Sequence, residues 1–399
     1  MSKQDKKSLS IILFVLVLII SVTYGISFLA RGYQISTKGK VSFLATGIIS
    51  ATSKPKGASV YIDDKLITAT DDTINLPPSE YTIKIVKDGY LPWQKTVQIK
   101  KEIVYQTDTQ LFRSSPDMKP ITLTGAINPV ISPDHSLVIY SVASASASKD
   151  NGLYLLELNN SLTFLSKNLP KQLSSNLQNL DWSKFNFIFS PNSKQILAYN
   201  TNNVNYLINL DNTTDFKNLY DITAKLSLIK EEWQTQEQQI IKSKIALLPT
   251  EIKAVISTNS AKNITFNSDE TKLLYLAQAD SSLKKDLITP PPAQSTQTQI
   301  RDIKKGNYYV YDLKDDTNFF IGSLEALYNP NWLANSNNLI YVEDQKIQTV
   351  EYDNTNKQTL FAGNFNKDVV YPWLDGNKII TLIAPYSNAQ ENLYSISIR

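Results

Sequence analysis

The sequence contains no cysteine, one histidine and only 12 glycines among its 399 residues. Without cysteine the chain can form neither a disulfide nor a thiolate metal site, and it has no cysteine nucleophile. The single histidine, His135, lies at the tip of an expected turn, where exposure to solvent is expected. We therefore expect neither a catalytic triad nor a multi-histidine metal site. Because glycine is scarce, the turns must rely on Asn, Asp and Ser.

Charge of either sign is also low. The formal net charge is +3 and 19% of residues are charged, which gives no indication of nucleic-acid binding. The 42% of hydrophobic residues is enough for a sizeable core, and a chain of this length is expected to hold two globular domains. Aromatic residues make up 10% of the chain and include 21 tyrosines, a composition that favours strands over helices.

The longest uncharged stretch is residues 9–30, LSIILFVLVLIISVTYGISFLA. About 20 apolar residues in a helix cross the roughly 30 Å core of a bilayer. Three lysines in the preceding tail, residues 1–8, place that tail in the cytoplasm. We predict a single-pass membrane anchor with the rest of the chain extracellular, at the cell surface. The alternative is a cleaved signal peptide, but the best small-x-small site, at Gly25–Ser27, is followed by further apolar residues.

After a spacer at 31–46, short period-two strands separated by turn residues fill 47–113 and indicate a small β-sandwich. The stretches SKPKGASVYIDDKL and INLPPSEYTIKIVKDGYLPWQKTVQI resemble the PEGA domain, a small β-module of bacterial and archaeal surface proteins. Lys56 stands where the tetrad that names the domain has an acidic residue. The resemblance implies a spacer or adhesion module without chemistry of its own. Tyr90 and Trp93 are expected as core aromatics rather than as a platform for a ligand.

Residues 120–399 repeat one pattern five times. Each copy has a strand, a turn rich in Asp, Asn and Ser, a second strand and a third, alternating strand. The copies begin at NPVISPDHSLVIYSV, FNFIFSPNSKQILAYNT, NITFNSDETKLLYLA, NPNWLANSNNLIYVED and VVYPWLDGNKIITLIA. A fourth strand is expected in the first four copies, at LTFLSK, FKNLYDI, NFFIGSL and KQTLFAG. Four antiparallel strands repeated in tandem are typical of β-propeller blades.

The fifth copy has no fourth strand of its own, and Pro120–Thr124 (PITLT) could supply it. We therefore predict an all-β ectodomain, a PEGA-like sandwich followed by a five-bladed propeller that strand exchange closes. The turn Ser132-Pro133-Asp134 resembles the turn of TolB-like and WD-repeat-like propellers, which bears on fold and not on function.

Two insertions interrupt the repeats. In 226–257, apolar residues recur near helical spacing and Pro249 opens a second short helix, so the pattern predicts an amphipathic helix on the propeller flank. A helix that docks a partner is the alternative. The residues with helical spacing are Leu226, Ile229, Trp233, Ile240 and Ile241. The second insertion, 279–305, is polar and proline-rich, and is either the first candidate for partner contact or a disordered tether.

The sequence has no nucleophile elbow, P-loop or dinucleotide fingerprint. Paired carboxylates at 63–64, 71–72 and 315–316 lie in expected turns, where turn chemistry explains them better than a glycosidase pair or a calcium site. The tryptophans near the innermost strands are expected in the core, with sugar stacking as the alternative; they are Trp182, Trp332 and Trp373. We therefore expect no catalytic residue, cofactor or metal, and assign no binding residue.

Three functions fit these patterns. The favoured one is a non-enzymatic surface protein that binds an envelope protein or glycan through the propeller. A carbohydrate-active propeller enzyme would need clustered carboxylates facing the channel, yet the inner strands begin mostly with Asn, Ile, Phe and Val. A purely structural spacer would show no concave polar or aromatic site. The oligomeric state cannot be inferred from these patterns.

Overall fold

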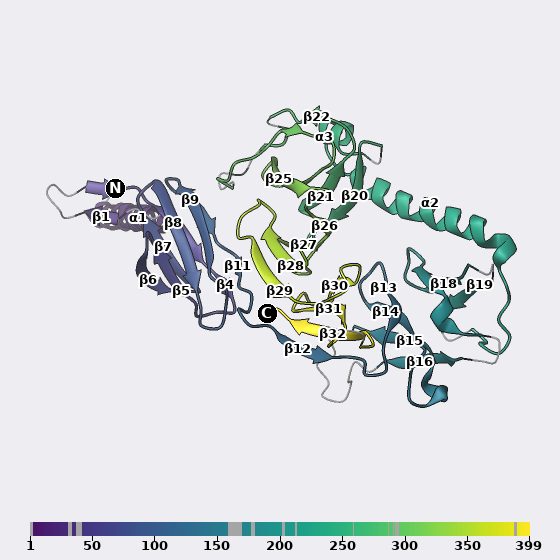
Figure 1. Cartoon of the computed structure of the whole chain (residues 1–399). Coiled ribbons are helices and arrows are strands. Elements are labelled where there is room, and N and C mark those ends of the chain that lie inside the picture. Colours follow the sequence, from purple (N-terminus) through teal and green to yellow (C-terminus); the bar gives the residue numbers. More distant parts are fainter. Residues whose placement is uncertain are drawn as a thin grey trace. The chain divides into compact units, whose positions relative to one another are not determined.

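The computed structural model describes residues 3–30, 34–36, 42–158, 170–176, 180–201, 204–211, 214–257, 259–285, 287–289, 291, 295–386 and 389–399. The chain divides into two compact units, Met1–Leu111 with Pro291–Gln297, and Phe112–Pro290 with Thr298–Arg399. Figure 1 shows helix α1 and the small β-domain in purple and blue, and the larger unit in colours from blue through green to yellow.

Helix α1 (Lys3–Ala30) covers the whole uncharged stretch. Its apolar side chains do not pack into a core: Phe14 is 68% exposed and Ile20 is 59% exposed. Within the described part of the chain, however, no helix combines the length and apolar character that a membrane crossing requires. The membrane anchor therefore stays a prediction. A short antiparallel pair follows α1, formed by β1 (Gln34–Ser36) and β2 (Ser42–Leu44).

The small β-domain consists of nine strands, β3 to β11. One sheet has the order β6-β5-β8-β9, a second has the order β10-β3-β7, and β11 pairs with β4. The strands are β3 (Gly47–Ala51), β4 (Ser53–Lys54), β5 (Ser59–Ile62), β6 (Lys65–Ala69), β7 (Asp72–Leu76), β8 (Ser79–Val86), β9 (Trp93–Ile99), β10 (Val104–Gln106) and β11 (Thr109–Gln110).

Alternating side chains of these sheets form one apolar core, as the period-two pattern predicts. Trp93 is 2% exposed and lies in this core, and Tyr90 packs against it, so both are structural aromatics as expected. Lys56, at the position of the usual acidic residue, lies 2.8 Å from the Asp71 carboxylate. The hydrogen bond from this ammonium holds the pKa of Asp71 below its usual value.

The larger unit contains five sheets of three or four strands among its described residues, which we call sheets I to V in chain order. Their orders are β13-β14-β15-β16 (I), β17-β18-β19 (II), β20-β21-β24-β25 (III), β26-β27-β28-β29 (IV) and β12-β32-β31-β30 (V). All neighbouring strands within them are antiparallel. This arrangement is a β-propeller-like fold, in which each sheet corresponds to one repeat of the sequence.

The bounds of these strands follow the predicted repeats closely. They are β12 (Asp117–Pro120), β13 (Ile127–Ile131), β14 (Leu137–Val142), β15 (Gly152–Glu157), β16 (Lys171–Ser175), β17 (Asn186–Phe189), β18 (Gln195–Tyr199), β19 (Asn205–Asn209), β20 (Ala261–Phe266), β21 (Lys272–Ala277), β24 (Asn307–Asp312), β25 (Thr317–Ser323), β26 (Tyr328–Trp332), β27 (Asn338–Glu343), β28 (Lys346–Glu351), β29 (Gln358–Ala362), β30 (Val370–Pro372), β31 (Lys378–Ile383) and β32 (Asn392–Ser397).

The turn between the first two strands of every sheet has the same backbone feature. One residue of each turn adopts a positive φ, between 54° and 70°; these residues are His135, Ser193, Glu270, Asn335 and Gly376. In sheet I the Asp134 carboxylate accepts hydrogen bonds from the Ser132 hydroxyl (2.6 Å) and the Ser136 N–H (3.1 Å). Polar side chains thus hold the turns where glycine is scarce.

Sheet V joins the two ends of the larger unit. Strand β12 pairs with β32, so the outermost strand comes from the start of the unit and the other three come from its end. The predicted strand exchange is therefore present, but β12 ends at Pro120 instead of beginning there. Beyond β12, the buried Thr122 hydroxyl accepts a hydrogen bond from the Leu393 N–H at 2.9 Å and extends the junction.

Two of the four predicted outer strands correspond to β25 and β29. In sheet I the outer strand is β16, and the predicted segment 162–167 lies outside the described residues. In sheet II the prediction of a strand at 216–222 is wrong, because this segment forms turns and loop. The loop still covers the edge of β19: the Ile222 N–H donates to the Asn205 carbonyl and the Thr214 hydroxyl accepts from the Asn209 N–H.

The first insertion forms the two predicted helices, α2 (Leu226–Ile245) and α3 (Thr250–Val255), with Pro249 directly before α3. Figure 1 shows α2 running between sheets II and III. The Lys230 ammonium lies 4.2 Å from the centre of the Tyr199 ring in sheet II, and Ile245 packs with sheet III. Of the predicted apolar face, Trp233 is buried but Ile240 is 48% exposed. The helix therefore covers the sheets with part of the predicted face.

The described residues of the second insertion include regular structure, which a tether would not need. Strands β22 (Ser281–Ser282) and β23 (Asp302–Ile303) pair with each other, and the neighbouring Leu283 is 3% exposed. In the smaller unit, Thr296 and Gln297 contact strand β9: the Gln297 amide donates to the Thr96 carbonyl at 2.7 Å, and the Thr296 hydroxyl accepts from the Gln98 N–H at 3.3 Å. The role of the second insertion, 279–305, in partner contact stays a prediction.

Candidate functional site

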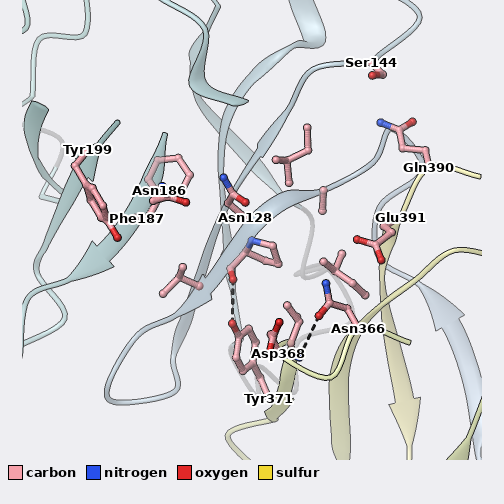
Figure 2. A pocket seen from close by; sticks show the side chains of 16 residues that line it. Asn128, Ser144, Asn186, Phe187, Tyr199, Asn366, Asp368, Tyr371, Gln390 and Glu391 are labelled. Atoms are coloured by element: carbon pink, nitrogen blue, oxygen red, sulfur yellow. Dashed lines mark hydrogen bonds between the residues drawn. The ribbon is translucent and has the colours of Figure 1, made fainter. Parts of the chain in front are cut away.

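A pocket of about 550 Å³ lies in the larger unit, where strands and loops of sheets I, II and V meet (Figure 2). The innermost strands β13 and β17 provide one part of its lining, and the segments around β30 and before β32 provide the rest. The polar or partly polar lining residues are Asn128, Ser144, Asn186, Tyr199, Asn366, Asp368, Tyr371, Gln390 and Glu391. A volume of this size falls in the range of small-molecule sites.

The local backbone explains why Asn128 faces the pocket. Asn128 adopts φ = 51° where the register of the β13–β14 pair shifts, so the strand carries a bulge at this point. Sheets III and IV have asparagines with φ = 50° at the corresponding shifts, Asn263 and Asn329. Asparagine tolerates the left-handed conformation better than most residues. The amide of Asn128 donates to the Phe185 carbonyl at 2.9 Å, and its side-chain oxygen forms no hydrogen bond with another described residue.

Several polar groups of the lining keep unused hydrogen-bonding capacity. The side chains of Asn186 and Glu391 form no hydrogen bond with another described residue, and both residues are exposed. The Gln390 amide donates to the Thr124 carbonyl (3.0 Å), and the Asn366 side-chain oxygen accepts from the Asp368 N–H (3.0 Å). The pocket therefore presents both donors and acceptors to a ligand.

Two tyrosines fix the far side of the pocket. The Tyr371 hydroxyl donates to the Pro129 carbonyl at 2.9 Å, which joins sheet V to sheet I, as Figure 2 shows. Burial, with a smaller effect from Asp368, raises the pKa of Tyr371 to about 12, so it stays a donor at neutral pH. The Tyr328 hydroxyl of sheet IV donates to the Asp368 carboxylate. Asp368 is thereby held between sheets IV and V.

The residues singled out from the sequence do not form this site. Trp182, Trp332 and Trp373 are at most 8% exposed, so they belong to the core and offer no open ring for a sugar. Of the paired carboxylates, Asp63 and Asp64 lie in a turn with positive φ, as expected. Asp316 is different: it is 4% exposed and ion-paired with Arg301 at 3.0 Å, so turn chemistry alone does not explain it.

His135 is half-buried, so the expectation that it is exposed is wrong. Burial lowers its pKa below 6.5, although Asp134 and a hydrogen bond with the Pro372 backbone oppose the shift. No group of three or more metal-ligating side chains occurs among the residues that the structure describes.

The lowered pKa predicts that acid destabilises the larger unit through His135. Below pH 6.5 the unfolded chain takes up a proton that the folded protein resists, so stability falls as the pH drops through this window. The loss has an upper limit of about 1.4 kcal/mol per pH unit. Melting temperatures of the wild type and of His135→Asn, measured between pH 7.5 and 5.5, check this. Asparagine suits the positive φ at this position, and the variant should lose less stability over the window. Identical losses would contradict the prediction.

Residues 46–115 match the PEGA domain family, which confirms the resemblance seen in the sequence. No curated protein matches the chain. Among solved structures, the chain is similar to the WD40 repeats of RRP9 (8% identity, 71% of this chain and 98% of that one, TM-score 0.31). It is also similar to TolB from Acinetobacter baumannii (14% identity, 80% of this chain and 61% of that one, TM-score 0.20). A third similar structure is an oligogalacturonate lyase in complex with manganese (14% identity, 71% of this chain and 72% of that one, TM-score 0.24).

Identities and TM-scores this low bear on neither activity nor ligand. The PEGA match and the sheet order together define the class: an all-β protein that combines a PEGA domain with a propeller-like unit.

Proposed function

We propose that this protein is a non-enzymatic binding protein of the cell surface, anchored in the membrane by α1. Its sheets I to V are the blades of a five-bladed propeller, and the pocket between sheets I, II and V recognises an envelope glycan or protein. Along the chain, the PEGA domain lies between α1 and this propeller.

The anchor is supported by α1 itself. Its described apolar side chains, from Ile12 to Ile26, are largely exposed, which would be costly in water and is favourable in a bilayer. The lysines at its start fit a cytoplasmic N-terminus.

The five-bladed ring is supported by contacts between successive sheets. Sheets V and I, I and II, and III and IV share apolar clusters. Sheets IV and V are joined by the bond from Tyr328 to Asp368, and helix α2 links sheets II and III. The pairing of β12 with β32 joins the two ends of the ring.

The pocket is the observation that carries the binding function. Residues from three different sheets converge on it, and exposed amide and carboxylate groups face it without partners among the described residues. Polar groups that the fold already holds in place lower the ordering cost of binding and so favour recognition of a ligand. A purely structural spacer would need no such concave polar site.

A carbohydrate-active enzyme is the second candidate, because Asp368 and Glu391 place two carboxylates in one pocket. An assay for new reducing ends after incubation with envelope polysaccharides separates the two. Turnover that disappears in both Asp368→Asn and Glu391→Gln would favour the enzyme.

The binding function predicts saturable attachment of the purified full chain, in detergent or nanodiscs, to isolated cell envelopes. Asn186→Trp fills the pocket and should weaken attachment at least about tenfold, since it blocks access to the polar lining. Glu237→Trp, on the exposed surface of α2, is the matched control and should leave attachment unchanged. Equal attachment of the wild type, Asn186→Trp and Glu237→Trp would refute a role for the pocket. Absence of attachment in all three proteins would refute the binding function.

A further inference from the structure

The charged side chains that line the pocket have one sign. Its lining contains the carboxylates Asp368 and Glu391 and, among the described residues, no lysine, arginine or histidine. Two lysines lie nearby but face tyrosine rings: Lys230 lies 4.2 Å from the Tyr199 ring centre and Lys367 lies 4.7 Å from that of Tyr328. Neither lysine lines the pocket. An anionic ligand would therefore meet two carboxylates and no cation among the described lining residues, which disfavours its binding.

The uncharged part of the lining is suited to hydroxyl groups. Side-chain amides of Asn128, Asn186, Asn366 and Gln390 can each donate and accept, as a sugar hydroxyl does. Figure 2 shows that these amides are spread around the pocket and come from different strands and loops. Tyr199 adds partly exposed ring surface on the side of sheet II, against which the C–H face of a sugar can pack, whereas the Phe187 ring is only 4% exposed and belongs to the core.

We infer that the pocket selects uncharged and amino-substituted sugars and rejects uronates. Glu391 is the residue that binds the ammonium group of the amino sugar, because its exposed carboxylate forms no hydrogen bond with another described residue. Asp368 adds negative charge but is already engaged by the Tyr328 hydroxyl. This inference rests on the binding function proposed above and names the ligand class of the same pocket.

The test uses three β-linked tetrasaccharides that share one backbone geometry, made of glucosamine, glucose or glucuronate. Their binding to the full chain in nanodiscs is measured by calorimetry at a pH at which the amine is protonated. A charge-assisted hydrogen bond is stronger than a neutral one, so glucosamine should bind at least about tenfold more tightly than glucuronate, with glucose between them.

The variant Glu391→Gln keeps the size of the side chain and removes its charge. It should reduce the ratio of the affinities for glucosamine and glucuronate by about tenfold. The affinity for the glucose tetrasaccharide should stay within about twofold of the wild-type value. Glu237→Gln, which removes the same charge from the exposed surface of α2, should leave all three affinities unchanged.

Glucuronate binding as tightly as glucosamine, or a preference that Glu391→Gln does not alter, would overturn the inference. The envelope attachment experiment distinguishes a wrong ligand class from a wrong binding function. Attachment to envelopes that Asn186→Trp abolishes, together with no binding of any tetrasaccharide, would overturn the sugar class and keep the binding function. Absence of both would overturn the two together.

Discussion

Asp316→Ala is expected to lower the free energy of unfolding of the larger unit by about 3–5 kcal/mol. The Asp316 side chain is 3% exposed and lies 3.0 Å from the Arg301 guanidinium. It also accepts hydrogen bonds from the Tyr311 hydroxyl (2.5 Å) and the Leu287 N–H (2.9 Å). Removing the carboxylate would leave a largely buried guanidinium without its counter-charge and two further donors without their acceptor.

Urea unfolding measures this loss, and Asp344→Ala is its matched control. Asp344 also adopts a positive φ (49° against 50°) but is exposed in its turn, so alanine introduces the same backbone strain there without stranding a charge. The loss of unfolding free energy in Asp316→Ala should therefore exceed the loss in Asp344→Ala by about 3 kcal/mol. Removing both charges, in Asp316→Ala/Arg301→Met, should cost less than removing Asp316 alone. Equal losses for the two aspartates would contradict the prediction.

The contacts of Asp316 also show a feature that local sequence patterns do not predict. Asp316 looked like a turn residue because its neighbour is also an aspartate and the strands on both sides were recognised. Its partners Arg301 and Leu287 lie in the proline-rich insertion, 15 and 29 residues away, which no local pattern connects to the turn. A buried ion pair depends on tertiary packing, whereas a turn depends on a few adjacent residues.

The elements that were predicted well are those with local periodicity. The PEGA strands, the repeats of the larger unit and the helices of the first insertion follow from alternation, turn residues and helical spacing. The fourth strand of sheet II failed because FKNLYDI alternates weakly and its Phe216 and Leu219 instead pack as a loop on the sheet core. The propensity of a short segment decides less than the contacts open to it.

The pocket could not be predicted for a different reason. Its polar residues come from separate parts of the chain, such as Asn128 in the first repeat, Asn186 in the second and Asp368 directly before the fifth. Each is an ordinary strand-end residue when viewed alone. The one usable signal was the asparagine that opens several copies, which the structure places at strand bulges. Convergence of such residues depends on how the sheets pack, and a single sequence does not encode that visibly.

Trp182→Ala is expected to cost about 3–5 kcal/mol of unfolding free energy, the range for loss of a large buried aromatic. Trp182 is 0% exposed, in the 3₁₀ turn Trp182–Lys184, which the Asp181 carboxylate caps by accepting the Ser183 N–H. Its ring lies 5.4 Å from that of Phe185 and 6.3 Å from that of Phe216, between centroids. Because Phe216 belongs to the loop that replaces a fourth strand, the indole fixes that loop to sheet II.

Trp182→Phe provides the control. Phenylalanine keeps most of the buried ring area and removes an indole N–H that has no hydrogen-bond partner in the described part of the chain, so it should cost clearly less than alanine. If Trp182 instead stacked on a sugar, alanine would weaken ligand binding and leave stability nearly unchanged. Urea unfolding and tetrasaccharide titration of the same variants therefore separate the two roles. We expect a large loss of stability and, at temperatures where the variants remain folded, unaltered affinity.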